Sequence, residues 1–147
     1  GWGTGGTMTG AGEIIKLARP ETQIVVAEPE NAALLSGKDW SPHKIQGWTP
    51  DFIPKVLNKN VADKFVPVSD NESIEVAKKL AKEEGIFTGI SGGASLAACF
   101  KAAEVAPENS TFCVMLPDTG ERYLSSPLFE DITDESDEQW LSNSSGD

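Results

Sequence analysis

Several classes of protein are made improbable by what this sequence of 147 residues lacks. No apolar run approaches the roughly 20 residues that a helix needs to cross a bilayer, so we expect no membrane partner. Lys and Arg number 12 against 23 Asp and Glu, which gives a formal net charge of −11. Because nucleic-acid backbones are bound by basic surfaces, we expect no nucleic-acid partner either.

Histidine and cysteine are scarce as well. His43 is the only histidine, and Cys99 and Cys113 are the only cysteines, with no spacing typical of metal ligands. We therefore expect no metal site. Both cysteines stand among apolar residues, which favours buried, reduced thiols and a cytoplasmic protein, with an organelle such as a plastid as the alternative.

The residues that are present are those of an ordinary globular domain. Hydrophobic residues make up 39% of the chain, and 14 glycines and 9 prolines are spread along it. A single domain of this length can bury roughly 68 to 70% of the surface that its unfolded chain exposes. Residues 130–147 are strongly acidic, and we expect them to form a tail separate from residues 1–129.

Helical and β-branched segments alternate, which predicts an α/β fold with a parallel sheet. Residues 11–19 have helical spacing, with Ala11, Ile14, Leu17 and Ala18 on the face expected to be buried. Residues 70–84 form the clearest helix, because Ser69 is spaced for a capping box and Gly85 suits the C-terminal cap. The remaining expected elements are helices over 51–57 and 95–106 and strands over 23–27, 64–68, 86–90 and 111–116.

Two glycine-rich loops each precede a predicted helix, at residues 1–10 and 91–94. Unpaired backbone N–H groups and the positive end of the helix dipole converge on an anion at such a place. In the first loop, the hydroxyl groups of Thr4 and Thr7 add two donors. The arrangement is typical of a site for one phosphate group.

The spacing of the first loop leaves other interpretations open. Gly1, Gly3 and Gly6 satisfy G-x-G-x-x-G, and Glu28 stands where a dinucleotide-binding fold places the acid that binds ribose. An NAD-binding Rossmann domain is therefore one alternative. A glycine turn that merely connects a strand to a helix is another.

The string Gly3-Thr4-Gly5-Gly6-Thr7 resembles the phosphate-binding loop of cysteine synthases (O-acetylserine sulfhydrylases) and of cystathionine β-synthases. These are fold-type II pyridoxal-phosphate enzymes, related to the tryptophan synthase β chain, and the resemblance implies their three-layer αβα fold, with a mostly parallel sheet between two helical layers. The resemblance continues in the same order through residues 28–29, 35–37, 42–47, 52–54, 89–94 and 116–124. The run at 120–124 is more similar to cysteine synthase than to cystathionine β-synthase.

The resemblance implies roles for particular residues. Residues Gly3, Thr4, Gly5, Gly6 and Thr7 would bind the phosphate of pyridoxal 5'-phosphate, and the Ser91 hydroxyl would face the pyridine nitrogen. Ser91 would be equally ordinary as a helix N-cap. Gln46 and Gly47 would belong to the loop that faces the substrate. Residues 48–51 depart from the family's small, glycine-containing run, which puts substrate preference in doubt.

The same resemblance implies that residues 1–129 are the C-terminal part of a longer enzyme, mostly its large cofactor-binding domain. The Schiff-base lysine would lie in a segment upstream of Gly1, so no catalytic residue is assigned in this chain, and the isolated fragment would be inactive. The expected reaction is cysteine formation from O-acetylserine and sulfide by β-replacement, in a homodimer that could accept the C-terminal tail of serine acetyltransferase. A cystathionine β-synthase-like enzyme and a non-catalytic, truncated binding module remain as alternatives.

Overall fold

The structure, a computed structural model, describes residues 1–130. The acidic tail expected at 130–147 therefore lies, apart from Glu130, outside the described residues. The described part contains the helices α1 (Gly6–Ala18), α2 (Asp70–Glu84) and α3 (Ile90–Glu104) and the strands β1 (Val25–Pro29) and β2 (Lys64–Val68). Three 3-10 turns complete it, η1 (Lys59–Val61), η2 (Gly120–Tyr123) and η3 (Pro127–Phe129). No helix among these residues is long and apolar enough to cross a membrane.

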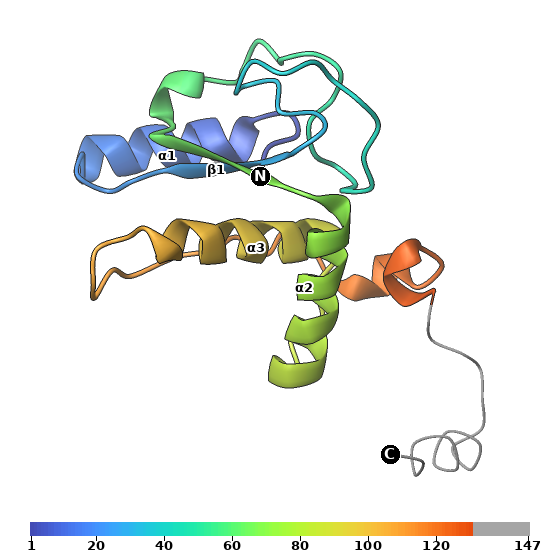
Figure 1. Cartoon of the computed structure of the whole chain (residues 1–147). Coiled ribbons are helices and arrows are strands. Elements are labelled where there is room, and N and C mark those ends of the chain that lie inside the picture. The colour runs from blue at the N-terminus through green and yellow to red at the C-terminus, as the bar shows by residue number, and fades with distance from the viewer. Residues whose placement is uncertain (131–147) are drawn as a thin grey trace, which may run out of the picture.

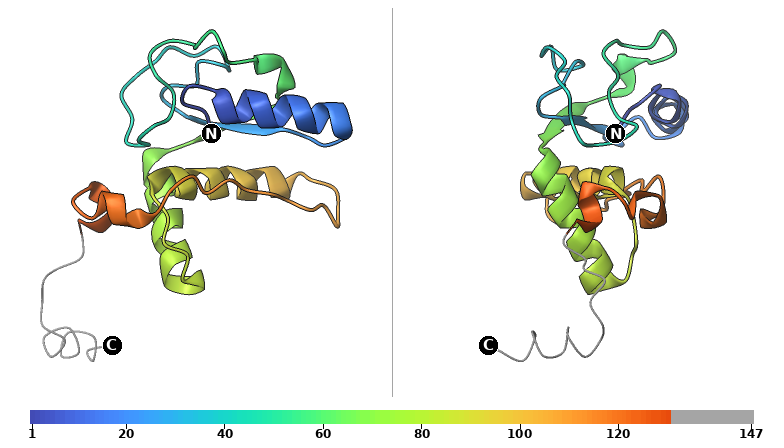
Figure 2. Two further views of the ribbon diagram at one scale, coloured as in Figure 1. Left: turned by 180° about the vertical axis from the view of Figure 1, so that it is seen from behind. Right: turned by 90° about the vertical axis from the view of Figure 1, so that its right-hand side faces the viewer.

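The two strands form a parallel sheet that lies between helical layers, as the sequence predicts. Val25 pairs with Lys64 at one end of the register, and Pro29 pairs with Val68 at the other. Figure 1 shows α1 on one side of the strands and α3 on the other, and the reverse view in Figure 2 agrees. Successive side chains of β1 point to opposite faces of the sheet, because side chains alternate along a strand. Val26 packs with Met8 of α1, and Ala27 belongs to the hydrophobic cluster that includes residues of α3.

Helix α2 has the boundaries that its capping signals predict. The Ser69 hydroxyl accepts a hydrogen bond from the Glu72 N–H, the Glu72 carboxylate accepts one from the Ser69 N–H, and Gly85 ends the helix with φ 68°. Helix α3 crosses α2 closely at Gly93, where an added Cβ would lie 2.1 Å from the carbonyl oxygen of Ser73. The absence of a side chain at Gly93 thus sets how near the two helices approach.

Helix α1 differs from the prediction in its start and in its buried face. It begins at Gly6, so that the end of the first glycine loop forms its first turn. Its buried residues are Met8 and Gly12, whereas Ile14 is 65% exposed and Leu17 is 83% exposed. The reason is that Gly12 packs against Val61 of η1, while the face expected to be buried meets no other layer within residues 1–130.

Three other predicted elements are wrong. Residues 51–57 form bends and a turn instead of a helix, and residues 86–90 and 111–116 form no strand. A strand exists only by pairing, and within residues 1–130 the one bridge near these segments is the isolated antiparallel bridge between Thr88 and Thr119, which lies beyond 111–116. The thiols are free, as expected, but Cys99 is only partly buried and Cys113 is exposed.

The close approach at Gly93 leads to a first prediction. Gly93→Ala in the complete protein should lower the free energy of unfolding by about 2 kcal/mol, because overpacking a tight contact costs about 1 to 3 kcal/mol. Asn71→Ala is the control, since Asn71 is an exposed residue of α2, and it should change stability by less than about 0.5 kcal/mol. Urea titrations would measure both. Equal stability of the two variants would contradict the packing argument.

Candidate anion site at the start of the first helix

The first turn of α1 presents backbone donors with nothing in the described residues to satisfy them. Gly5 is the N-cap and has no side chain to fill that role, and the first turn carries no acidic residue. The first helical bond runs from the Thr9 N–H to the Gly5 carbonyl, which leaves the amides of residues 6–8 free. Thr4 and Thr7 are exposed, and within residues 1–130 their hydroxyl groups make no hydrogen bond.

Glycine is required at two positions of this loop for steric reasons. A Cβ at Gly3 would lie 2.3 Å from the Gly47 carbonyl oxygen, and one at Gly5 would lie 2.7 Å from the Leu57 side chain. Gly5 also has φ 82°, in the left-handed region that glycine adopts without strain. The loop therefore keeps its backbone close to its neighbours on one side and open toward a ligand on the other.

The predicted substrate loop lies directly beside the glycine loop. The Gly47 carbonyl touches Gly3, and the Thr49 N–H donates to the Trp2 carbonyl at 2.8 Å. Gly47, with φ 81°, forms the turn in which the Trp48 N–H bonds to the Ile45 carbonyl at 3.2 Å. Gln46 and Gly47 are both exposed. The structure thus brings together two segments that are about 40 residues apart.

Glu28 organises the far side of the loop. Its side chain is completely buried, and Oε1 accepts from the Trp2 indole at 3.2 Å and from the Leu35 N–H at 2.8 Å. Its other oxygen accepts from both the N–H and the hydroxyl of Ser36. A carboxylate that is buried and bonded by four donors is not available to a ribose, which removes the basis for the dinucleotide interpretation. Its role is to join the glycine loop to the turn after β1.

Ser91 lies in the first turn of α3, so the predicted second glycine loop is in fact helical. The N-cap is Gly89, which makes the N-cap alternative for Ser91 wrong. Gly92 permits close packing instead, because an added Cβ would lie 1.9 Å from the Thr88 hydroxyl. Ser91 is buried, and its hydroxyl has no hydrogen-bond partner within the described chain. Figure 1 shows α1 and α3 running in the same direction, with their N-terminal ends at the carboxyl ends of the strands.

Asp118 lies beside the start of α3. No pattern in the sequence predicts this position. A Cβ at Gly89 would lie 2.6 Å from Asp118 Oδ1, which is buried and has no hydrogen-bond partner among residues 1–130. The Tyr123 hydroxyl donates to Oδ2. This hydrogen bond, with some burial, raises the pKa of Tyr123 to about 12, because ionisation would set two negative groups against each other.

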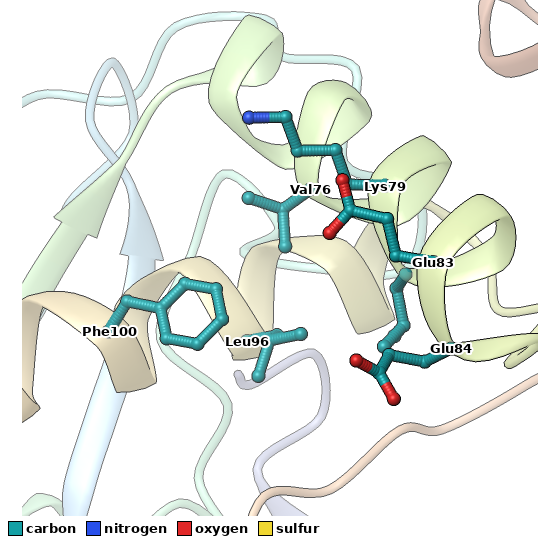
Figure 3. Close-up of a pocket in the computed structure, with 7 residues that line it drawn as sticks. Val76, Lys79, Glu83, Glu84, Leu96 and Phe100 are labelled. Carbon is teal, nitrogen blue, oxygen red and sulfur yellow. The ribbon is translucent and has the colours of Figure 1, made fainter.

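A separate hollow of about 140 Å³ lies between α2 and α3 (Figure 3). Val76, Leu96 and Phe100 form its apolar part, and Glu83 and Glu84 stand at its edge. It contains no residue of the glycine loop, the loop at 45–49 or the Ser91 turn. Lys79 also lines it, but the two carboxylates outnumber this one cation, which makes the hollow unsuited to a phosphate group and not the functional site.

The fold and the site together define an α/β domain with free donors at the start of a helix, and comparison with known proteins identifies it further. Residues 1–118 match the family model described as pyridoxal-phosphate dependent enzyme. The chain belongs to this family. The free backbone N–H groups and the Thr4 and Thr7 hydroxyls at residues 4–8 form a cradle that fits the cofactor's phosphate monoester. These donors are uncharged and unpaired, and the first helical turn carries no carboxylate.

Relatives narrow the identification to fold-type II enzymes. The chain is 48% identical over 143 residues to an O-ureido-L-serine synthase of Streptomyces lavendulae, covering 97% of this chain and 44% of that protein. It is 43% identical over 129 residues to a cysteine synthase of Staphylococcus aureus, covering 88% and 42%. The chain thus spans less than half the length of these relatives.

Solved structures agree with this assignment. The crystal structure of O-ureido-L-serine synthase superposes with a TM-score of 0.89 at 48% identity, covering 96% of this chain and 45% of that one. The structure of O-acetylserine sulfhydrylase isoform 3 from Entamoeba histolytica gives 0.85 at 37% identity, covering 97% and 43%. The predicted fold class and cofactor are therefore confirmed, and the chain corresponds to part of such an enzyme.

The role of Glu28 yields a second prediction. Glu28→Ala in the complete protein should lower the free energy of unfolding by about 3 kcal/mol or more, because it leaves buried donors unpaired and opens a cavity. Glu30→Ala is the control, since that side chain is exposed and should change stability by less than about 0.5 kcal/mol. Denaturant titration monitored by tryptophan fluorescence would compare them. A loss below about 1 kcal/mol for Glu28→Ala would refute the structural role.

Proposed function

We propose that the complete protein containing this chain is a β-replacement enzyme that converts O-acetylserine and sulfide to cysteine and acetate, with pyridoxal phosphate as cofactor. The observation that carries the proposal is the cradle of free amide and hydroxyl donors at residues 4–8, held open beside the loop at 45–49. Relatives named cysteine synthase at 43% identity support the same reaction. In it the bond between the β-carbon and the acetyl oxygen breaks, and a β-carbon to sulfur bond forms.

The first task of this chain is to bind the cofactor phosphate. The residues that would hold it are Gly3, Thr4, Gly5, Gly6 and Thr7, through backbone N–H groups and two hydroxyls. The positive end of the α1 dipole adds to their attraction for a dianion. Glycine at Gly3 and Gly5 keeps the backbone close enough for these donors to converge.

The other two site segments would act on the ring and on the substrate. The hydroxyl of Ser91, a residue that is 4% exposed and whose hydroxyl lacks a partner within the described chain, would bond to the pyridine nitrogen. A neutral partner leaves that nitrogen less positive than a carboxylate would, which suits departure of a group from the β-carbon. When bound, the cofactor would supply the sink for the electron pair left on the α-carbon when the α-proton is lost. The exposed residues Gln46 and Gly47 would face the substrate.

The complete protein would have to supply what residues 1–130 do not contain. We propose that a preceding segment carries the lysine that binds the cofactor covalently, and that residues 1–129 are mostly the large cofactor-binding domain. The exposed apolar side chains of Ile14 and Leu17 on α1 support this, as does the coverage of only 42 to 44% of the relatives. Such a segment would cover that face of α1.

A second candidate reaction is favoured by the loop that follows Gly47. Trp48, Thr49, Pro50 and Asp51 replace the small residues expected in a cysteine synthase, so the space beside the substrate differs. The relative at 48% identity is named for O-ureido-L-serine, whose β-carbon bears the oxygen of a ureido group. The corresponding nucleophile is hydroxyurea, which would displace acetate in the same way as sulfide.

Cofactor affinity tests the cradle. Thr7→Val should weaken binding of pyridoxal phosphate by the complete protein about tenfold, because a hydrogen bond to a charged group contributes about 1.5 to 3 kcal/mol. Titration of the cofactor-free protein, followed by the absorbance of the bound cofactor, gives the dissociation constant. Thr111→Val is the control, because Thr111 is exposed and distant in sequence from both loops. Unchanged affinity for Thr7→Val would remove Thr7 from the site.

Competition between nucleophiles tests the reaction. The complete enzyme, supplied with O-acetylserine, should release acetate with either sulfide or hydroxyurea, and mass spectrometry identifies the amino-acid product. Cysteine as the main product at equal nucleophile concentrations supports the first candidate, and O-ureidoserine supports the second. Release of acetate with neither nucleophile would overturn both.

A further inference from the structure

Thr49 holds a backbone conformation that its residue type rarely adopts. Its φ is 32°, in the left-handed region, where a β-branched side chain crowds the backbone. The residue is only 1% exposed, and its hydroxyl has no hydrogen-bond partner within residues 1–130. The side chain therefore does not hold this conformation by hydrogen bonding. Strained backbone of this kind persists only where the surroundings fix it, and it is common at functional sites.

Two ring donors from the preceding loop fix it. The Trp40 indole N–H donates to the Thr49 carbonyl oxygen at 2.9 Å, and His43 Nε2 lies 3.3 Å from the same oxygen. A carbonyl oxygen only accepts hydrogen bonds, so Nε2 of His43 is the donor in this contact. The two rings contact each other edge to face, with centroids 6.5 Å apart. Together they form a clamp, Trp40 and His43, on one carbonyl group.

The clamped residue is connected to the cofactor cradle on its other side. The Thr49 N–H donates to the Trp2 carbonyl at 2.8 Å, and Trp2 immediately precedes Gly3. Gly3 in turn abuts the carbonyl of Gly47, two residues before Thr49. The orientation of the Thr49 peptide thus bears directly on where the glycine loop lies. Released from the clamp, Thr49 would turn to a negative φ and its N–H would leave Trp2.

We propose that Trp40 and His43 are positioning residues of the cofactor site, acting through the strained Thr49 peptide on the glycine loop. They do not touch the cofactor. Their effect is to keep the phosphate-binding amides arranged before the cofactor arrives. This inference rests on the proposed function, because it takes the glycine loop to be the place where the cofactor's phosphate is bound.

The test uses the complete protein and measures cofactor affinity instead of turnover. The variants Trp40→Phe and His43→Phe, alone and together, keep an aromatic ring but remove the donor. We expect the dissociation constant for pyridoxal phosphate to rise about tenfold in the double variant, a change equivalent to about 1.4 kcal/mol. His43→Gln retains an N–H donor and should restore affinity relative to His43→Phe. Ser41 is exposed and lies between Trp40 and His43 in the sequence. Ser41→Ala is therefore the control, and its affinity for pyridoxal phosphate should be unchanged.

A rescue experiment separates positioning from general stability. Glycine adopts positive φ without strain, so Thr49→Gly in the double variant should bring the dissociation constant back to within about threefold of the unaltered protein. The melting temperature of the cofactor-free protein is measured alongside. Loss of affinity that follows the melting temperature, with no rescue by glycine, would overturn the inference, and so would unchanged affinity in the double variant. If the unaltered protein binds no pyridoxal phosphate, the proposed function itself fails.

Discussion

The carbonyl oxygen of Gly47 occupies the place where a side chain on Gly3 would have to be, and the site depends on this close approach. It fixes the glycine loop against a segment about 40 residues further along the chain. The hydrogen bond from Thr49 to Trp2 reinforces the contact next to it. The two loops contact each other here through backbone atoms. A methyl group added at Gly3 would therefore push them apart.

The buried carboxylate of Glu28 gives the same region its rigidity. It gathers the Trp2 indole and the turn at Leu35 and Ser36 around the carboxyl end of β1. Four hydrogen bonds satisfy it without a cation, so it behaves as a structural centre. The first turn of α1, on the other side of Trp2, keeps its donors free. The polar groups around Glu28 are thus all hydrogen-bonded, whereas the donors in the first turn of α1 are free to bind a ligand.

Local signals in the sequence predicted the elements whose causes are local. Helix α2 was predicted with its boundaries because Ser69 and Gly85 act within one turn of it. The strand at 64–68 was predicted from its own residues, but β1 was placed two residues too early. Segments 86–90 and 111–116 were predicted as strands and are not, because a strand needs a neighbour that no local pattern can supply. The buried face of α1 was missed for the same reason.

The residues of the candidate site could be predicted from the sequence, but the contacts that hold them in place could not. The donors at Thr4 and Thr7 follow from residue type and from the helix that begins beside them. The resemblance to cysteine synthases added Ser91, Gln46 and Gly47, whose roles stay predictions. Neither source indicated that Trp40 and His43 hold the Thr49 carbonyl. Such contacts arise from tertiary packing, which single positions do not encode.

The most direct test of the account is a crystal structure of the complete protein with pyridoxal phosphate bound. The account predicts the phosphate group within about 3 Å of backbone nitrogens in residues 4–8 and of the Thr7 hydroxyl, with Gly47 still against Gly3. A phosphate group bound elsewhere, with the first turn of α1 left to water, would contradict it.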